Sequence, residues 1–517
     1  MFEKRPDGAS RRQTRVDKER KEKRKVRIMA ISIAAALVLL FSGAMFINSN
    51  LIRRTLPALS IGSVNFSAVE FDYNFLSAVN EYQSYYTQML GDYASDYLPS
   101  TDTPFSEQVQ NEETGETWAD YFSEMAIQKM SSAVQIYTAS RADNFVMPDD
   151  AVAALDNEIA LIKQQAEWYG YPSLERFLTQ MYGTSLNERS LRKILEFSYI
   201  VSSFSKHKYD SFEYTAQELA QHYYENADTL DIFAFRGFMV NAAYVDDYEY
   251  PTDEEYQIAF EAALANAGDR AAAIAANIEN EDDFIAAAKE YDEITYEDPG
   301  STLAHYMGGD LIYEPFGEWM LDASRVKGDV TTADASSGEG TYVILFVERD
   351  KNEYQTGRLR QIYIAPESIN PDDFQEGEED TAYITALLTA TSEASARAEA
   401  VYSEFKAGGA TEEKFLELVP EHSDNSTEGG LFEKIAKYTL FPEIDEWLFA
   451  PERKYGDHEL FESESGFHVV FFLGLGERNC DVLADSALRD IDYQAWTESL
   501  LPVEAVRRWA FTLIRRQ

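Results

Sequence analysis

Apolar and polar positions follow three successive patterns along this chain. Residues 28–47 form an apolar run without a charged residue, and about 20 such residues, rising about 1.5 Å each, cross a hydrocarbon core of about 30 Å. Residues 60–228 place apolar side chains at spacings of three and four, which indicates amphipathic helices. From residue 229 to residue 476, short apolar strands alternate with such helices, which predicts an α+β fold.

The first helix of the region 60–228 carries its own start signal. Ser67 precedes Glu70 by three residues, which is the spacing of a capping box. The apolar face then continues through Phe71, Phe75 and Val79. Further amphipathic stretches follow, so this region is expected to form one helical domain. Helical segments return in residues 477–517.

Residues 229–352 and 355–476 repeat one local order of elements. Each begins with a strand and helices, and each continues with a Gly-Gly turn, a helix containing Glu-Trp, a Ser-Gly pair and an apolar strand. The Gly-Gly turns are Gly308-Gly309 and Gly429-Gly430, and the Glu-Trp pairs are Glu318-Trp319 and Glu446-Trp447. Such repetition predicts two domains of the same fold. About 120 residues each is enough for an independent core.

Charge assigns the two ends of the apolar run to opposite sides of a membrane. Residues 1–27 carry twelve Lys or Arg against five Asp or Glu, and basic segments stay on the cytoplasmic side. Residues 28–48 are therefore expected to form a single transmembrane helix in the cell membrane, with the bulk of the chain extracytoplasmic. A cleaved signal peptide is the alternative, because Ser42-Gly43-Ala44 resembles a small-x-small cleavage site.

The rest of the chain is strongly acidic. Of 45 basic and 91 acidic residues, 33 and 86 follow residue 27, which gives a net charge of −53 and disfavours nucleic-acid binding. Solubility explains this charge, with recognition of basic clients as the alternative. The only cysteine, Cys480, rules out an intramolecular disulfide. The histidines show no metal-ligand spacing and no phosphate-binding or nucleophile motif occurs, so neither a metal nor a cofactor is expected.

The repeated order of elements resembles the parvulin-type (PpiC) peptidyl-prolyl isomerases. Two such units in series behind a membrane segment resemble the extracytoplasmic foldases of this class. The resemblance implies that residues 60–228 are a helical chaperone-like domain and that the C-terminal helix of residues 477–517 packs back on it. The partners would be unfolded or nascent secreted polypeptides that contain Xaa-Pro bonds. Aromatic residues in the helical domain are expected to be core, with a client-binding groove as the alternative.

The resemblance also implies a site in residues 355–476. His468, in Gly466-Phe467-His468-Val469-Val470, matches the family's histidine on the last strand. Gln361 stands where the family has a second histidine, so the usual histidine pair is not expected to form. The expected catalytic residues are His468, Asn425, Gln361 and Ser463, and the expected substrate-binding residues are Phe432, Leu440, Ile444, Phe467 and Ser423. The alternative for His468 is an ordinary core histidine.

The first repeat departs further from the family pattern. Tyr342 stands at the position of His468 and the strand 237–240 lacks a histidine, so residues 229–352 are expected to be a degenerate, inactive domain. Three functions are compatible with the sequence: a membrane-anchored isomerase and foldase, a holdase that binds clients with inactive parvulin folds, or an envelope scaffold with one fixed partner. We adopt the first as the expectation.

Overall fold

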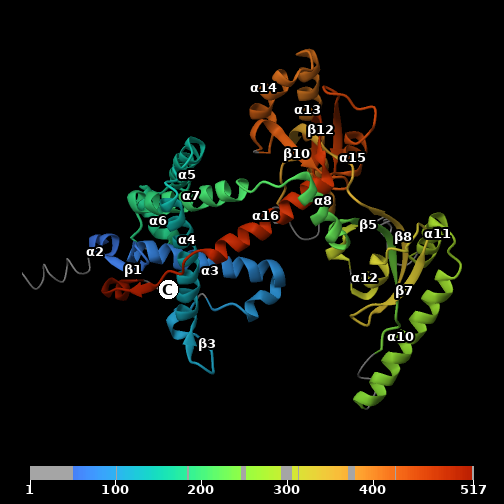
Figure 1. Ribbon diagram of the computed structural model, residues 1–517, viewed down its shortest axis with the longest axis horizontal. Coiled ribbons are helices and arrows are strands. Elements are labelled where there is room, and N and C mark those ends of the chain that lie inside the picture. Colours follow the sequence, from blue (N-terminus) through green and yellow to red (C-terminus); the bar gives the residue numbers. More distant parts are fainter. Residues whose placement is uncertain are drawn as a thin grey trace, which may run out of the picture. The chain divides into compact units, whose positions relative to one another are not determined.

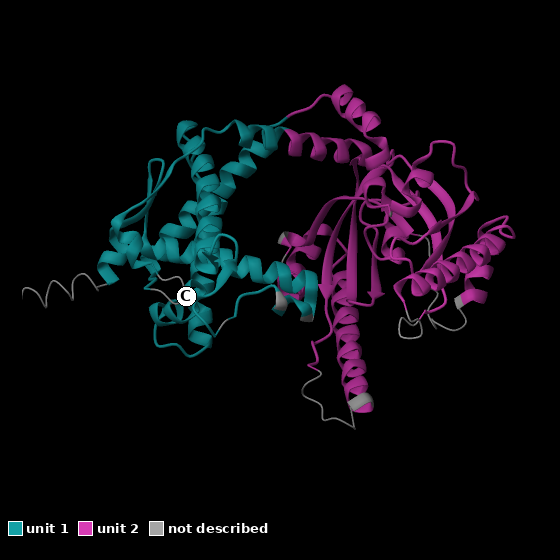
Figure 2. Cartoon of the chain, turned by 90° about the horizontal axis from the view of Figure 1, so that it is seen from below, with its two compact units in different colours: residues 1–212, 492–517 teal, residues 213–491 magenta. Residues whose placement is uncertain are grey.

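The computed structural model describes residues 50–100, 102–182, 185–245, 252–292, 305–312, 314–370, 379–425 and 427–514. The expected transmembrane helix, residues 28–48, lies outside these ranges. Among the helices within them, none combines the length and the apolar composition that a membrane span requires. The described chain forms two compact units, residues 50–212 with 492–514 and residues 213–491 (Figure 2).

The first unit is mainly helical. Its helices are α2 (Asn50–Thr55), α3 (Ala68–Leu90), α4 (Trp118–Ala142), α5 (Asp149–Trp168), α6 (Leu174–Tyr182) and α7 (Glu188–Asp210). A small sheet has the order β13-β1-β2, made of β13 (Ala505–Arg507), β1 (Pro57–Ile61) and β2 (Val64–Ser67), and β3 (Val109–Asn111) pairs with β4 (Glu116–Thr117). Because β13 comes from the end of the chain, C-terminal residues do return to the helical unit, and they join it through a strand as well as a helix.

The start of α3 confirms the predicted capping box. The Ser67 hydroxyl accepts a hydrogen bond from the backbone N–H of Glu70 at 3.4 Å, and the Glu70 carboxylate accepts one from the backbone N–H of Ser67 at 2.7 Å. Phe71 and Phe75 are fully buried in the core of this unit. The spacing of three and four therefore marked the buried face correctly.

The second unit contains two modules, which we call the first module (residues 232–350) and the second module (residues 355–478). The chain enters through α8 (Ala216–Glu225) and α9 (Ala227–Leu230), and α16 (Asn479–Ser499) follows the second module. The first module consists of β5 (Ile232–Asn241), α10 (Asp253–Ala275), α11 (Glu281–Asp292), β6 (His305–Gly308), α12 (Glu314–Leu321), β7 (Val330–Asp334) and β8 (Gly340–Asp350). The second consists of β9 (Gln355–Ile364), α13 (Glu379–Ala407), α14 (Glu412–His422), β10 (Leu431–Ile435), α15 (Pro442–Leu448), β11 (His458–Ser463) and β12 (Gly466–Arg478) (Figure 1).

The two modules fold alike. Their four-stranded sheets have the orders β6-β5-β8-β7 and β10-β9-β12-β11, with antiparallel neighbours throughout. The repeated Gly-Gly turn has a steric cause, because it passes close to the backbone near the first strand. A Cβ atom added to Gly309 would lie 1.7 Å from the carbonyl oxygen of Asp228, and one added to Gly430 would lie 2.3 Å from that of Gln361. The fold class is α+β, as predicted.

The sheet of the second module separates two apolar layers. On one face, Ile362, Val469 and Phe471 pack with residues of α13 and α14. On the other face, Val470 and Phe472 pack with Ile444 and Leu448 of α15. Successive side chains of a strand point to opposite faces, so each residue of β9 and β12 belongs to one layer or the other.

Candidate functional site

Strand pairing places His468 on the α15 face of the second module's sheet. On β12, His468 lies opposite Tyr363 of β9, and Val470 lies opposite Gln361. Residues two apart on a strand share a face, and diagonal neighbours on paired strands are within reach of each other's side chains. His468, Tyr363 and Gln361 therefore meet on the same face as the apolar layer around Val470.

Both nitrogens of the His468 ring have hydrogen-bond partners. Nδ1 lies 2.8 Å from Nε2 of Gln361, and Nε2 lies 2.8 Å from Oγ of Ser463. An amide nitrogen can only donate, so Nδ1 is the acceptor and the neutral ring carries its hydrogen on Nε2. The Ser463 hydroxyl accepts that hydrogen and in turn donates to the carbonyl oxygen of Gly466 at 3.1 Å. Gln361, which was expected at the site in place of a second histidine, thus sets the tautomer of His468.

Burial keeps this histidine neutral. His468 exposes only 5 % of its surface, and desolvation lowers its pKa from the ordinary value near 6.5. No carboxylate contributes to the shift. A neutral ring with both nitrogens engaged is suited to holding neighbouring groups in place, and it is poorly suited to transferring protons to a substrate.

Two aromatic rings flank the imidazole. The centroid of the Tyr363 ring on β9 lies 5.1 Å from that of the His468 ring. The centroid of the Phe441 ring, just before α15, lies 5.4 Å from it. The Tyr363 hydroxyl donates to the carbonyl oxygen of Ser465 at 2.5 Å, which ties it to the turn between β11 and β12. Phe441 is 36 % exposed. The sequence analysis did not select either residue, although Phe441 directly follows Leu440, which it did select.

Three of the expected substrate-binding residues, Phe432, Leu440 and Ile444, converge on this face, and we call them the apolar cup. Ile444 belongs to the buried cluster with Val470 and Leu359, and Phe432 and Leu440 pack against the same cluster while remaining partly exposed. Ile444 is only 3 % exposed. Phe432 and Leu440 can therefore contact a bound ligand, whereas Ile444 supports them from beneath.

Ser423 and Asn425 shape the loop after α14. The Ser423 hydroxyl accepts hydrogen bonds from the backbone N–H groups of Tyr363 at 3.2 Å and of Asn425 at 3.3 Å. The side-chain oxygen of Asn425 accepts from the backbone N–H of Thr427 at 2.9 Å and from its hydroxyl at 2.7 Å. Ser423 is therefore linked to the residue that flanks His468, while Asn425 directs its carbonyl oxygen to its own loop.

Phe467 lies on the opposite side of the sheet from His468. It is 5 % exposed and packs in the layer formed with α13 and α14. Because it is adjacent to His468 on one strand, the two side chains must face opposite ways. The structure does not bring Phe467, which was expected to bind substrate, to the face that carries the apolar cup.

Among the described residues of the first module, no hydrogen-bonded histidine corresponds to His468 on this face. Tyr342 of β8, at the position of His468, lies opposite Met239 and packs edge-to-face on Phe316 with centroids 5.8 Å apart. Gly237 stands on β5 at the position of Gln361 and has no side chain to offer. Apolar residues of β5, β8 and α12 fill the face instead.

Comparison with known proteins identifies the second module. The family model of the PPIC-type PPIASE domain, a rotamase, matches residues 381–473. That range includes His468, Ser463, Asn425 and the three cup residues, whereas Gln361 lies before it. This part of the chain is a parvulin-type peptidyl-prolyl isomerase domain.

Two solved structures are also similar to this chain. One belongs to work on PEB4 and Cj1289, two SurA-like chaperones of Campylobacter jejuni, and shows 16 % identity and a TM-score of 0.15 over 42 % of this chain and 77 % of that one. The other is PrsA from Bacillus subtilis, with 13 % identity and a TM-score of 0.15 over 54 % of this chain and 87 % of that one. No curated protein sequence matches.

Proposed function

We propose that this peptidyl-prolyl isomerase is a membrane-anchored, extracytoplasmic foldase that acts on Xaa-Pro bonds of exported polypeptides. The observation that carries the proposal is the shared face in the second module. There, His468, with both ring nitrogens hydrogen-bonded, shares one face of the sheet with the partly exposed Phe432 and Leu440.

The reaction requires little chemistry from the protein. Rotation about the Xaa-Pro bond crosses a barrier of about 20 kcal/mol, and no covalent bond is formed or broken. The planar amide is more polar than the twisted one, because rotation ends the conjugation that separates its charges. Apolar side chains that hold the proline ring and exclude water therefore favour the twisted amide. Phe432, Leu440 and Phe441 supply such a surface.

The hydrogen bonds around His468 keep this surface in shape. Gln361 and Ser463 fix the ring from both sides, and the ring contacts Tyr363 and Phe441. Since the bonds are internal, they do not have to form anew when the substrate rotates, which is the advantage of a preorganised site.

A proline-exchange measurement tests the activity. The full chain in detergent should accelerate cis/trans exchange in an Xaa-Pro peptide, observed by NMR exchange spectroscopy. Phe432→Ala and His468→Ala should each reduce the acceleration. An exchange rate equal to the uncatalysed rate at high protein concentration would exclude the activity.

The membrane location is supported by the apolar run 28–47 behind a tail of twelve basic and five acidic residues. The protein should sediment with membranes, and deletion of residues 1–48 should release it. Protease added to the outside of cells with an intact cell membrane should digest the bulk of the chain. A soluble native protein of full mass would contradict anchoring.

A non-catalytic holdase is the second candidate. It is favoured by the first module, whose site face is filled with apolar side chains, and by Asn425, whose side-chain oxygen is bound within its own loop. Such a protein would suppress aggregation of an unfolded client and leave proline exchange unchanged.

A further inference from the structure

The loop between β10 and α15, residues 436–441, forms one wall of the candidate site, and we call it the cup loop. It carries Leu440 and Phe441 at its end, the first in the cup and the second against His468. Its position therefore decides where two of the exposed apolar contacts lie.

The first module contacts the cup loop directly. The ring of Tyr306 on β6 stacks on the ring of Tyr438, with centroids 3.9 Å apart and an angle of 11° between the planes. The Tyr438 hydroxyl donates to the carboxylate of Glu348 on β8 at 3.4 Å. Two strands of the first module thus meet one side chain of the second.

Tyr438 is also tied to the second module. Its backbone N–H donates to the carboxylate of Asp445 on α15 at 2.9 Å, and Asp445 is buried. Its φ angle is +66°, a conformation that a residue with a bulky side chain seldom adopts unless its surroundings impose it. The stacked Tyr306 ring and the Asp445 carboxylate are two such surroundings.

The linker between the modules, residues 351–354, holds Lys437, the residue of the cup loop that precedes Tyr438. The Tyr354 hydroxyl accepts the backbone N–H of Lys437 at 3.0 Å and the side-chain amide of Asn479 at 3.0 Å, and it donates to Asn352 at 3.3 Å. The Lys437 ammonium lies 4.5 Å from the centre of the Tyr354 ring.

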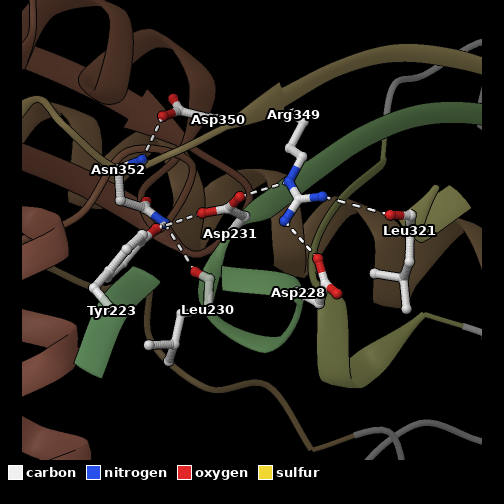
Figure 3. A network of polar contacts seen from close by, with 8 residues as sticks. All are labelled: Tyr223, Asp228, Leu230, Asp231, Leu321, Arg349, Asp350 and Asn352. Atoms are coloured by element: carbon white, nitrogen blue, oxygen red, sulfur yellow. Dashed lines mark hydrogen bonds and ion pairs between the residues drawn. The ribbon is translucent and has the colours of Figure 1, made fainter. Parts of the chain in front are cut away.

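Asn352 connects Tyr354 to the residues that directly precede β5 of the first module. Its side-chain amide donates to the Tyr223 hydroxyl at 3.0 Å and to the carbonyl oxygen of Leu230 at 2.9 Å, and Tyr223 donates to Asp231 at 2.7 Å (Figure 3). Asp231 is paired with Arg349 at 2.6 Å. Figure 3 shows Tyr223, Leu230 and Asp231 on one side of this network and Arg349 and Asn352 bonded to them. The cup loop is therefore held at two consecutive residues, Lys437 and Tyr438.

We propose that the first module acts as a support for the proline site of the second, and that Tyr306 is a positioning residue that holds the cup loop through Tyr438. This inference rests on the proposed isomerase function. The inference gives the first module a role in the reaction. This module sets the position of Leu440 and Phe441 without contacting the substrate.

Hydrogen exchange and steady-state kinetics on the full chain test this role. A stacked aromatic pair corresponds to a change of about two- to tenfold in an equilibrium. Tyr306→Ala should accelerate exchange of the Lys437 and Tyr438 amides by about that factor. It should raise KM for an Xaa-Pro peptide to a similar extent while kcat stays nearly constant. Tyr306→Phe keeps the ring and should behave as the wild type.

Two further variants complete the design. Tyr244→Ala removes a tyrosine of the first module that is 89 % exposed, and it should change neither quantity. Tyr438→Ala removes the stack from the other side and also the hydrogen bond to Glu348. Adding Tyr306→Ala to Tyr438→Ala should therefore cause no loss beyond that of Tyr438→Ala alone, because the stack is already absent. The inference is overturned if Tyr306→Ala leaves amide exchange and KM at wild-type values, if Tyr244→Ala has the same effect, or if the two losses are additive. Absence of isomerase activity in the wild type would overturn the proposed function, while the exchange of the two amides would still report on the contact.

Discussion

Gln361 donates an amide hydrogen to Nδ1 of His468 across 2.8 Å, and this single contact decides which nitrogen of the ring carries the proton. The two residues lie on neighbouring strands as diagonal neighbours on one face. A glutamine at this position therefore does not leave the histidine without a partner. It supplies a neighbour whose side chain carries no charge at any pH.

Loss of this hydrogen bond should weaken catalysis without unfolding the module. Gln361→Ala removes the donor to Nδ1, and a typical internal hydrogen bond contributes about 1 kcal/mol. We expect kcat/KM for proline exchange to fall about fivefold. Gln361→His supplies a new donor and should recover most of the loss. Gln355→Ala, at the exposed start of the same strand, is the control. If Gln361→Ala reduced kcat/KM no more than Gln355→Ala does, the role of Gln361 would be contradicted.

The pH dependence of His468 follows from its burial. Desolvation lowers its pKa in the folded protein, whereas the unfolded chain binds its proton near pH 6.5. Between these two values the unfolded state holds more protons, so stability rises with pH. The contribution of His468 is therefore complete above about pH 6.5 and declines as the pH falls toward the folded pKa.

An NMR titration of the imidazole checks this prediction. The ring signals of His468 should remain those of a neutral ring when the pH is lowered through 6.5, with the hydrogen on Nε2. Gln361→Glu places a carboxylate beside Nδ1 and should raise the pKa and move the hydrogen to Nδ1. A wild-type midpoint at or above 6.5 would contradict the prediction.

Local patterns of the sequence were sufficient for the fold of both modules. Apolar runs indicated the strands, and the repeated Gly-Gly turn indicated two domains of the same fold, whose sheets have the same strand order. In the first unit, Ser67 and Glu70 likewise indicated the start of α3. These features depend on short-range sterics and on burial, which leave a regular trace in the sequence. Phe432, Leu440 and Ile444, which lie in or against one apolar cluster, were expected from the family resemblance and not from such local patterns.

The parts of the site that escaped prediction depend on long-range geometry. Phe441 contacts His468 because of the path of a loop, and Tyr306 contacts Tyr438 because two modules meet. Neither contact has a periodic signal. Phe467 is a different case, since strand alternation alone places it opposite to His468. Applying this alternation to the sequence would have excluded Phe467 from the expected substrate-binding residues on the face of His468.

The cup residues should separate into binding and support. Leu440 is partly exposed and Ile444 is 3 % exposed. Leu440→Ala should raise KM about tenfold through lost contact with the proline ring. Ile444→Ala should instead lower the free energy of unfolding by roughly 2–5 kcal/mol, because it leaves a cavity in the core. Peptide kinetics and urea unfolding of both variants distinguish the two roles. Equal effects on both quantities would show that the distinction by exposure is wrong.

Removing one partner of the Asp231–Arg349 ion pair in the first module should destabilise the protein more than removing one partner of a surface pair, because the remaining charge is left buried. Asp231 exposes 1 % of its side chain and Arg349 exposes 19 %, and they lie 2.6 Å apart. Arg349→Met leaves the Asp231 carboxylate buried without its cationic partner, while the Tyr223 hydroxyl still donates to it, and breaking a buried pair in this way costs about 3–5 kcal/mol.

The control is the Lys206–Asp210 pair, whose side chains are 76 % and 55 % exposed. Lys206→Met should change stability by less than about 1 kcal/mol. Hydrogen exchange of β5 and β8 under increasing urea reports the first module directly. Adding Asp231→Asn to Arg349→Met should recover part of the loss, because it removes the uncompensated charge. Arg349→Met could instead prove no more destabilising than Lys206→Met. The network around Asp231 would then have no role in holding the first module together. In that case, Tyr306 alone would hold the cup loop against the first module.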